Sequence, residues 1–503
     1  MEKISIKYKI PLAAVSILVV SGSLWTTSMN AYAQTSTPTA IEIMENAAGS
    51  MPSANNDIIL RTLNSALGLN IKLDNFQSAT DYQNQLNVRL AAGNFPDLFQ
   101  IPSRSELLQL QSQGVLLNLT PYLKQLRPTV NFTNTTLKDG EVSGQLYAIS
   151  KAPNLNYSTY WIRRDWLNRL HLKMPTTIAQ LFQVAKAFTY DDPNGDGKKD
   201  TYGIVGQGLA AFAPIFGAFD VGLPANDGDL YVKDGKLVDA YFDPNMPKAL
   251  AFIRKMVKAG VVDPSIVTST SPTQVQQSAF EGQDGIMFLD WPNVTKSTYV
   301  QEYKKVDPKA NWVQLGAPSG PYGKNDGSFG LEASSGMYGI PSVLAKDPKT
   351  LQKVFDLLNY VSSPAGNRLV QYGLPGRDYK LVHGKVVPLP MMQQEGYYFW
   401  TYQFTGRPEL QYLDTKFAPQ ARYIGFAAHQ PMIKTLNQFV SYPSGYNAND
   451  ADTYAYQEII NFIYGKQPLT DYKNFLKTLS TTYNFTSYLA AAQTQLHKLG
   501  FVK

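Results

Sequence analysis

The stretch DIILRTLNSALGLNIKLDNF, residues 57–76, decides the fold class of this 503-residue chain. Its first twelve residues carry apolar side chains at helical spacing and end at Gly68, a residue typical of helix ends. The residues that follow, 70–76, predict a strand. A helix that leads directly into a strand is part of a βαβ unit, so the stretch favours an α/β fold.

The same alternation continues on both sides of this stretch. Residues 41–44 (IEIM) predict a strand before it, and residues 81–93, 95–101 and 105–114 predict a helix, a short buried strand and a further helix after it. This order is typical of a mostly parallel sheet with helices on both faces. Ligands bind such sheets beyond the carboxyl ends of the strands, so the loops after residues 44 and 101 are candidate binding loops.

A second α/β stretch begins near residue 160 and runs to about residue 293. A connector rich in Gly and Pro follows at residues 312–327, and the last 120 or so residues carry many Tyr and Phe. No internal repeat is present. Further helices are expected at residues 248–260, 347–361, 363–373, 451–465, 469–480 and 486–500.

The N-terminus has the pattern of a secretory signal peptide. Lys3, Lys7 and Lys9 precede an apolar run at residues 10–20, and Ala-Tyr-Ala at residues 31–33 matches a cleavage site. We expect a signal at residues 1–33 and an exported protein that begins at Gln34, with an uncleaved anchor as the alternative.

Composition excludes several classes of chemistry. The chain has no cysteine, which excludes disulfides, a thiol nucleophile, Cys-based metal sites and a cysteine-linked lipid anchor. The net charge of +6 is small and spread along the chain, so we expect no nucleic-acid partner.

The run YDDPNGDGKKD, residues 190–200, matches most of an EF-hand-type calcium loop. Counted from Asp192, oxygen ligands recur at every second position and a glycine occupies position 6, where the loop turns sharply. Position 12, which carries a glutamate in an EF-hand, is Gly203. A solvated turn is the alternative, because Asn, Asp and Gly also form turns. The predicted ligands of a structural Ca²⁺ are Asp192, Asn194, Asp196, Lys198 through its carbonyl, and Asp200.

Several motifs, taken in order, resemble a known family. They are LAAGNFPDLFQI at residues 90–101, GQLYAISKAPNLNYSTYWIRRDWL from residue 144, FEGQDGIMFLDW at residues 280–291 and SSPAGNRLVQYG at residues 362–373. The chain is similar to extracellular solute-binding proteins of ABC importers, in the oligosaccharide-binding branch that includes alginate-type binders and polysaccharide-uptake lipoproteins. The resemblance covers residues 41–376 well, and the order of the motifs carries it.

The resemblance implies a two-lobed periplasmic-binding-protein fold of type II, with a ligand cleft between the lobes. Each lobe would be a mostly parallel sheet flanked by helices. The implied division places residues 34–155 and 313–376 in the N-lobe, residues 156–312 in the C-lobe, and residues 377–503 mainly in the helical completion of the C-lobe. The chain departs from the family where relatives carry a lipidated cysteine, and at Thr201, where alginate-type relatives have a further acidic ligand.

The candidate ligand-binding residues come from matching positions. Trp291 follows the strand at residues 284–290, and Arg104 and Asn46 follow strands of the first lobe. A core tryptophan and a solvated arginine are the alternatives for the first two. Trp161 and Arg163 belong to the crossover, where packing is the alternative role. The predicted ligand-binding residues are Trp291, Arg104, Trp161, Arg163, Trp400 and Asn46.

The expected function is capture of an oligosaccharide by a monomer that delivers it to membrane permeases. No motif of a serine hydrolase, zinc protease or P-loop enzyme is present, so we expect no catalysis. Two alternatives remain open: a surface carbohydrate-binding or sensory protein without a transporter, and a glycosidase that uses two of Asp290, Glu332 and Glu395.

Overall fold

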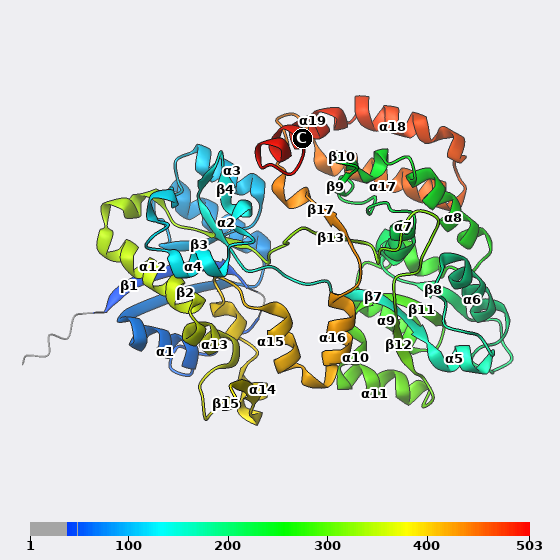
Figure 1. Ribbon diagram of the computed structural model, residues 1–503, viewed down its shortest axis with the longest axis horizontal. Coiled ribbons are helices and arrows are strands. Elements are labelled where there is room, and N and C mark those ends of the chain that lie inside the picture. Colours follow the sequence, from blue (N-terminus) through cyan, green and yellow to red (C-terminus); the bar gives the residue numbers. More distant parts are fainter. Residues whose placement is uncertain (1–37, 48) are drawn as a thin grey trace, which may run out of the picture. The chain divides into compact units, whose positions relative to one another are not determined.

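The computed structural model describes residues 38–47 and 49–503 (Figure 1). The proposed signal peptide, residues 1–33, lies outside the described residues. The first sheet has five strands, and its two parallel pairings join β1 to β2 and to β3. The other two pairings, of β14 with β3 and with β6, are antiparallel. The order is β2 (Leu69–Phe76), β1 (Thr39–Asn46), β3 (Leu98–Ile101), β14 (Met337–Gly339) and β6 (Ala148–Ser150).

Local sequence explains the start of this sheet. Helix α1 (Ile58–Leu67) begins after Asp57, whose carboxylate accepts a hydrogen bond from the Leu60 amide at 2.9 Å. The helix ends at Gly68, whose φ of 63° is in the left-handed region that glycine adopts without strain. Strand β2 starts at the next residue and pairs with β1, which confirms the helix and the strand predicted over residues 57–76.

Helices bury both faces of the first sheet. Successive residues of β1 point to opposite faces. Ile43 packs in a cluster with residues of α1 and α12, whereas Met44 packs in another with residues of α2 and α3. The helices of this lobe are α1, α2 (Ala79–Ala91), α3 (Arg104–Ser112), α4 (Arg127–Phe132), α12 (Pro348–Ser362) and α13 (Pro364–Tyr372).

A second sheet forms the base of the other lobe. Its single parallel pairing joins β11 to β8, and the pairings of β7 with β11 and β12 are antiparallel. The order is β12 (Trp312–Leu315), β7 (Ser158–Arg163), β11 (Asp284–Asp290) and β8 (Tyr202–Val205). Its helices are α5 (Arg164–Arg169), α6 (Ile178–Tyr190), α7 (Ala213–Ala218), α8 (Met246–Lys258), α9 (Pro272–Phe280), α10 (Pro292–Thr295) and α11 (Ser297–Val306).

A third, smaller sheet joins the same core. Its order is β10 (Lys236–Asp239), β9 (Leu230–Lys233), β17 (Ile433–Thr435) and β13 (Ser328–Gly330). Helices α17 (Ala448–Tyr464), α18 (Tyr472–Thr481) and α19 (Phe485–Lys498) pack their aromatic side chains into the core of the second lobe.

Residues 377–503 contribute to both lobes. Tyr398, Phe399, Tyr402 and Phe404 join the core of the first lobe, whereas residues from 433 onward join that of the second. Before Tyr398 lie β15 (Tyr379–Val382), β16 (Lys385–Pro388) and α14 (Pro390–Glu395), and between Phe404 and residue 433 lie α15 (Glu409–Lys416) and α16 (Ala421–Ala428). The segment expected to complete mainly the second lobe therefore divides its core residues between the two lobes.

Three connecting segments meet where the chain passes between the lobes. The Lys151 amide donates to the Gly336 carbonyl at 2.9 Å, the Ala152 amide to the Thr405 carbonyl at 2.9 Å, and the Asn154 amide to the Ala333 carbonyl at 2.7 Å. We call residues 151–157, 333–336 and 403–407 the crossing segments.

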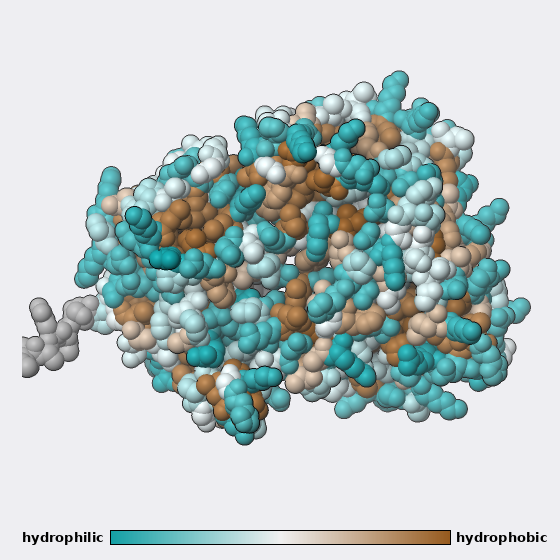
Figure 2. Space-filling model, viewed as in Figure 1, coloured by the Kyte–Doolittle hydropathy of each residue, from teal (hydrophilic) through white to brown (hydrophobic). Residues whose placement is uncertain are grey.

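The α/β two-lobe fold is confirmed. Strand pairing is parallel on both sides of β1, as predicted, but each of the two large sheets also contains antiparallel pairs. These arise because β14 runs antiparallel to β3 in the first sheet and β12 runs antiparallel to β7 in the second. Hydrophilic side chains cover most of the viewed face (Figure 2). Within residues 38–503, excluding residue 48, no helix combines the length and the apolarity that a bilayer crossing requires.

Candidate functional site

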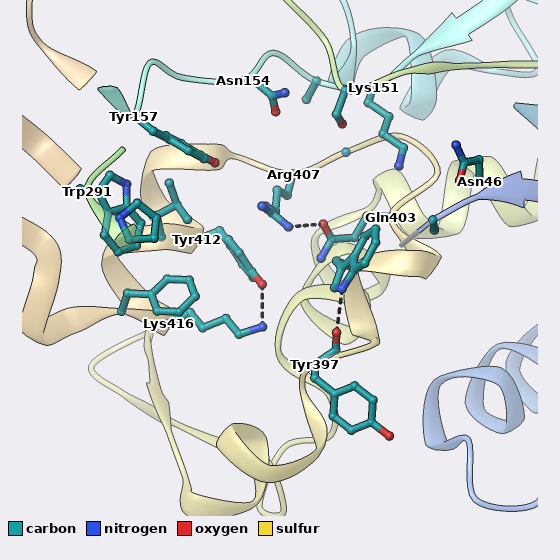
Figure 3. A pocket seen from close by; sticks show the side chains of 18 of the residues that line it. Asn46, Lys151, Asn154, Tyr157, Trp291, Tyr397, Gln403, Arg407, Tyr412 and Lys416 are labelled. Atoms are coloured by element: carbon teal, nitrogen blue, oxygen red, sulfur yellow. Dashed lines mark hydrogen bonds between the residues drawn. The ribbon is translucent and has the colours of Figure 1, made fainter. Parts of the chain in front are cut away.

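A cavity of about 540 Å³ lies at the crossing segments, and we call it the crossing cavity (Figure 3). It is lined by the ends of β1 and β11, by the crossing segments and by helix α15. Both lobes therefore supply its walls, as expected of a binding site that closes around a solute.

The first lobe contributes polar side chains at the carboxyl ends of its strands. Asn46 ends β1, and its backbone amide donates to the Gln100 side chain of β3 at 2.8 Å. The next amide, of Ala47, donates to Asn75 Oδ1 at 2.9 Å. These bonds fix the loop after β1, and they place the predicted residue Asn46 in the cavity wall.

Aromatic rings form the wall on the side of the second lobe. Trp291 directly follows β11, is 2% exposed and lines the cavity. Its ring packs edge-on against Tyr157 and Phe417, with centroids 6.2 and 5.5 Å away. Its indole Nε1 has no hydrogen-bond partner among the described residues. Trp291 is thus a core residue that also borders the cavity.

Trp400, a further predicted residue, also lines the crossing cavity. Its indole Nε1 donates to the Tyr397 carbonyl at 2.7 Å, which fixes the ring (Figure 3). The six-membered part of the indole lies 3.4 Å from the position that a Cβ on Gly49 would occupy, so the ring packs at van der Waals distance from this loop.

Arg407 lies at the centre of the cavity wall and is already paired. Its guanidinium donates through two nitrogens to Glu409, at 2.6 and 2.9 Å, and through the third to Gln403 Oε1 at 2.8 Å. Its Cζ lies 3.7 Å from the centroid of the Tyr412 ring. Arg407 therefore holds Gln403 and Tyr412 in position, and Glu409 compensates its charge.

Lys416 carries an ammonium group with neutral partners only. Its Nζ donates to the Tyr412 hydroxyl at 2.8 Å and to the Gly396 carbonyl at 2.9 Å (Figure 3). Burial, reinforced by the charge of Arg407, lowers the pKa of Lys416 to about 8. The fold thus holds this amine in a place that disfavours its charge.

Lys151 lies in the first crossing segment and is 8% exposed. Burial lowers its pKa, and nearby Glu45 opposes this effect. Burial likewise raises the pKa of Glu45 to about 7, and that carboxyl group accepts a hydrogen bond from the Tyr338 hydroxyl at 2.6 Å. The two groups partly compensate each other without forming a direct ion pair within 4 Å.

A second cavity, of about 410 Å³, shares Asn154 and Tyr157 with the first, and we call it the aspartate cavity. Asp290 accepts a hydrogen bond here from the Ser158 hydroxyl. Asp326 is fully buried, and neither of its carboxyl oxygens has a partner among the described residues. Burial raises the pKa of Asp326 well above its usual range and so favours its neutral form.

Three predicted binding residues lie away from the crossing cavity, and their expected place in the cleft is corrected. Arg104 is the first residue of α3, and its guanidinium donates to the Asp139 carbonyl at 2.8 Å inside the first lobe. Trp161 is fully buried in β7 and donates to the Leu289 carbonyl at 3.0 Å. Arg163 ends the same strand and pairs with Asp165 and Asp307.

Arg163 has a structural role that its position in β7 explains. Its guanidinium lies over the rings of Trp166 and Trp312, at 4.6 and 5.7 Å from their centroids. The two carboxylates compensate the buried charge. The residue thus stabilises the start of α5 and the end of α11, the packing alternative considered for the crossover.

The proposed calcium loop is curled as its spacing requires. Asp192 has a φ of 50°, and Gly195 and Gly197 have φ of 78° and 77°. The Asp192 carboxylate accepts from the amides of Gly195 at 2.8 Å and Asp196 at 3.1 Å. Its oxygens therefore face the inside of the loop, where a hard cation would bind.

The residue types of the loop fit a cation, although its carboxylates alone are insufficient. Among the residues that the structure describes, no three Asp, Glu or His side chains gather closely enough to hold a metal ion. Asn194, the Lys198 carbonyl and water would have to supply the remaining ligands. The Thr201 hydroxyl instead donates to the Phe188 carbonyl at 2.8 Å and ties the loop to α6. The calcium site stays a prediction.

Sequence reasoning missed most of the polar wall. Lys151, Tyr157 and Arg407 lie on crossing segments, and Tyr412 and Lys416 on α15. Tyr157 and Lys151 do fall within the crossover motif, which was a usable signal. No local pattern marks Arg407 or Lys416, because their place in the cavity depends on contacts between distant segments.

Comparisons with known proteins agree with this geometry. Residues 59–375 match the profile of a family described as bacterial extracellular solute-binding protein. The lipoprotein LipO of Bacillus subtilis (strain 168) is 28% identical over 384 residues, covering 75% of this chain and 73% of that protein. The polygalacturonan/rhamnogalacturonan-binding protein YtcQ of the same organism is 27% identical over 305 residues, covering 59% of this chain and 58% of that protein.

The fold is also similar to solved structures. One is the ABC-transporter substrate-binding protein FusA of S. pneumoniae, an EF-hand mutant in complex with fructo-nystose, with a TM-score of 0.64 and 20% identity over 92% of this chain and 99% of that one. Since the family profile spans more than half of the chain and the fold agrees, this protein belongs to the bacterial extracellular solute-binding protein family.

Proposed function

We propose that this protein is the extracytoplasmic solute-binding component of an ABC importer and that it captures an oligosaccharide in the crossing cavity. The observation that carries the proposal is a cavity with walls from both lobes that combines aromatic rings with hydrogen-bonding side chains. Aromatic faces stack on the apolar C–H face of a pyranose, while Asn46, Gln100 and Asn154 supply amides for its hydroxyls.

Lobe closure and delivery to permeases follow from this role. The crossing segments would provide the hinge, because they hydrogen-bond to one another where the chain passes between the lobes. We expect a monomer outside the cytoplasm that meets permease subunits.

The crossing cavity supports binding without catalysis. None of its described lining residues is Asp or Glu, whereas a glycosidase places two carboxyl groups about 5 to 10 Å apart across the scissile bond. A hydrolase using Asp290 and Asp326 of the aspartate cavity is the competing proposal. A sensory protein without a transporter would share the fold.

Calorimetry of the purified chain against a panel of neutral and acidic oligosaccharides tests the proposal. We expect a dissociation constant near 1 μM, or about −8 kcal/mol, for at least one sugar, with no release of reducing ends. No binding across the panel would overturn the proposal, and so would released product. Dependence of import on this protein in cells, together with its permeases, distinguishes a transporter component from a sensor.

We also propose that the loop at residues 192–200 binds a structural Ca²⁺. The curled backbone and the inward carboxylate of Asp192 support it. Extracellular calcium modules bind with dissociation constants of about 10⁻⁴ to 10⁻³ M, so 10 mM Ca²⁺ should raise the melting temperature. The variant Asp192→Asn with Asp196→Asn should lose this response, whereas Asp234→Asn, in a turn of the second lobe, should keep it. An equal response of all three proteins would contradict the site.

A further inference from the structure

The crossing cavity has a one-sided charge. Its lining includes Lys151, Lys296, Arg407 and Lys416, and no Asp or Glu is present among the described lining residues. Arg407 is paired with Glu409 behind the wall, which leaves three amines. The charge that faces a ligand is therefore positive.

Two of these amines, of the buried Lys151 and the half-buried Lys416, have no ionised partner in contact. No carboxylate of the described residues lies within 4 Å of the Nζ atoms of Lys151 or Lys416, although other ion pairs of the protein meet that distance. Lys416 uses two of its three donors, both on neutral oxygens. The Nζ of Lys151 donates to no described residue and points into the cavity (Figure 3).

Such an arrangement is costly unless an anion completes it. An ammonium group that leaves water without a full counter-charge destabilises the fold, and the lowered pKa values of both lysines reflect this cost, which Glu45 offsets only in part at Lys151. A bound carboxylate would accept the free donors of both amines in charge-assisted hydrogen bonds. Lys296 is exposed at the rim, where it adds long-range attraction for an anion.

The remaining walls define what carries the carboxylate. Tyr157 and Trp400 are partly exposed aromatic side chains suited to a pyranose face, and the amides of Asn46 and Asn154 suit its hydroxyls. Simple inorganic anions would leave these surfaces unused. We propose that the crossing cavity selects an acidic oligosaccharide and that Lys151 and Lys416 bind the carboxylates of its uronic acid units. This inference rests on the proposed function and specifies its substrate class.

Pairs of sugars that differ only in charge test the inference. Calorimetry would compare trimers of galacturonate, mannuronate, guluronate and glucuronate with their methyl esters, alongside neutral fructo- and gluco-oligosaccharides. We expect one acidic trimer to bind best and at least about tenfold more tightly than its own ester. Equal affinity for acid and ester, or a neutral sugar as the best ligand, would overturn the inference and leave the proposed function intact. Failure of every sugar would overturn the proposed function itself.

Substitutions of the two cavity lysines test whether these residues cause the preference for the acid over the ester. In Lys151→Gln and in Lys416→Gln, the ratio of affinities for acid and ester should fall toward one, by about tenfold in each. Lys258→Gln, which removes an exposed charge at the end of α8, serves as the matched control and should keep the ratio. An unchanged ratio in both cavity variants would overturn the assignment.

A measurement on the unmodified chain keeps the inference testable if the variants fail to fold. Raising NaCl from 0.05 to 0.5 M should weaken binding of the acidic trimer more than binding of its ester, because salt screens the ionic part of the interaction. The same salt dependence for both sugars would count against an ionic contact.

Discussion

The two cavities that share Asn154 and Tyr157 carry opposite ionisable groups. The crossing cavity has three lysines and a paired arginine but no carboxylate, whereas the aspartate cavity has two aspartates and no cation among its described lining residues. Neither cavity contains an internal ion pair that would cancel its charge. The basic side chains thus line one cavity and the acidic side chains the other. This separation fits a ligand whose acidic part lies in the crossing cavity and whose neutral, hydroxyl-bearing part lies in the aspartate cavity.

The difference extends to protonation. Burial lowers the pKa of Lys416 to about 8 and raises that of Asp326 well above its usual range. At neutral pH the lysine is therefore mostly charged, whereas burial favours the neutral form of the aspartate.

The largest expected effect concerns the ring that borders the crossing cavity and its core. Trp291→Ala should lower the free energy of unfolding by about 3 to 5 kcal/mol, because it leaves a void beside Tyr157 and Phe417. Urea denaturation measures it. Trp400→Ala, in the same cavity but less buried, should cost less, and a larger loss for Trp400→Ala would reverse the roles assigned to the two rings.

The next largest effect is the pH dependence of the affinity of the crossing cavity for an acidic oligosaccharide. A bound carboxylate favours the charged form of Lys416, so complex formation takes up a proton once the pH exceeds the free pKa of about 8. Affinity for an acidic oligosaccharide should fall about tenfold between pH 7 and pH 9. Calorimetry in buffers of different ionisation enthalpy would reveal the proton uptake, and a flat profile to pH 9.5 would exclude Lys416 from the contact.

The free protein should gain stability when the same charge is removed. Because the pKa of Lys416 in the fold lies below its value of 10.5 in an unfolded chain, the charged amine destabilises the fold below about pH 8, and the effect fades as the pH rises to 10.5. Lys416→Met should therefore raise the free energy of unfolding by about 1 kcal/mol at pH 7, and by nothing near pH 10.5. A loss of stability at pH 7 would show that its two hydrogen bonds outweigh the cost of burial.

The smallest expected effect tests the aspartate cavity. With a raised pKa, Asp326 makes the fold less stable as the pH rises from about 4, where the unfolded chain ionises, toward the pKa in the fold. Asp326→Asn should therefore raise the melting temperature by about 2 °C at pH 7 and leave it unchanged at pH 3.5. Asp234→Asn, in an exposed turn, is the control, and an equal shift at both pH values would contradict the protonation argument.

Local patterns predicted the elements better than the site. Residues 57–76 contain their own helix cap, glycine stop and strand, so the βαβ order could be read directly. Asn46 and Trp291 follow strands that were recognised, and both line the crossing cavity. Their binding roles remain predictions.

The positions of the other site residues depend on contacts between segments that are distant in sequence, so local patterns do not predict them. Arg104 also follows a recognised strand, but it starts a helix, and the Asp139 carbonyl draws its side chain into the first lobe. Trp161 and Arg163 share β7 with cavity-proximal residues yet point into the core. Conversely, the lowered pKa of Lys416 comes from burial and from Arg407, features created only by packing.

The order of the cavity residues along the chain has a consequence for synthesis. One wall begins at Asn46 and another ends at Phe417, with the crossing segments drawn from three separate stretches between them. Contacts so distant in sequence form late and slowly. A nascent chain that stops short of residue 417 lacks part of the pocket, so ligand capture becomes an all-or-none property of the finished polypeptide.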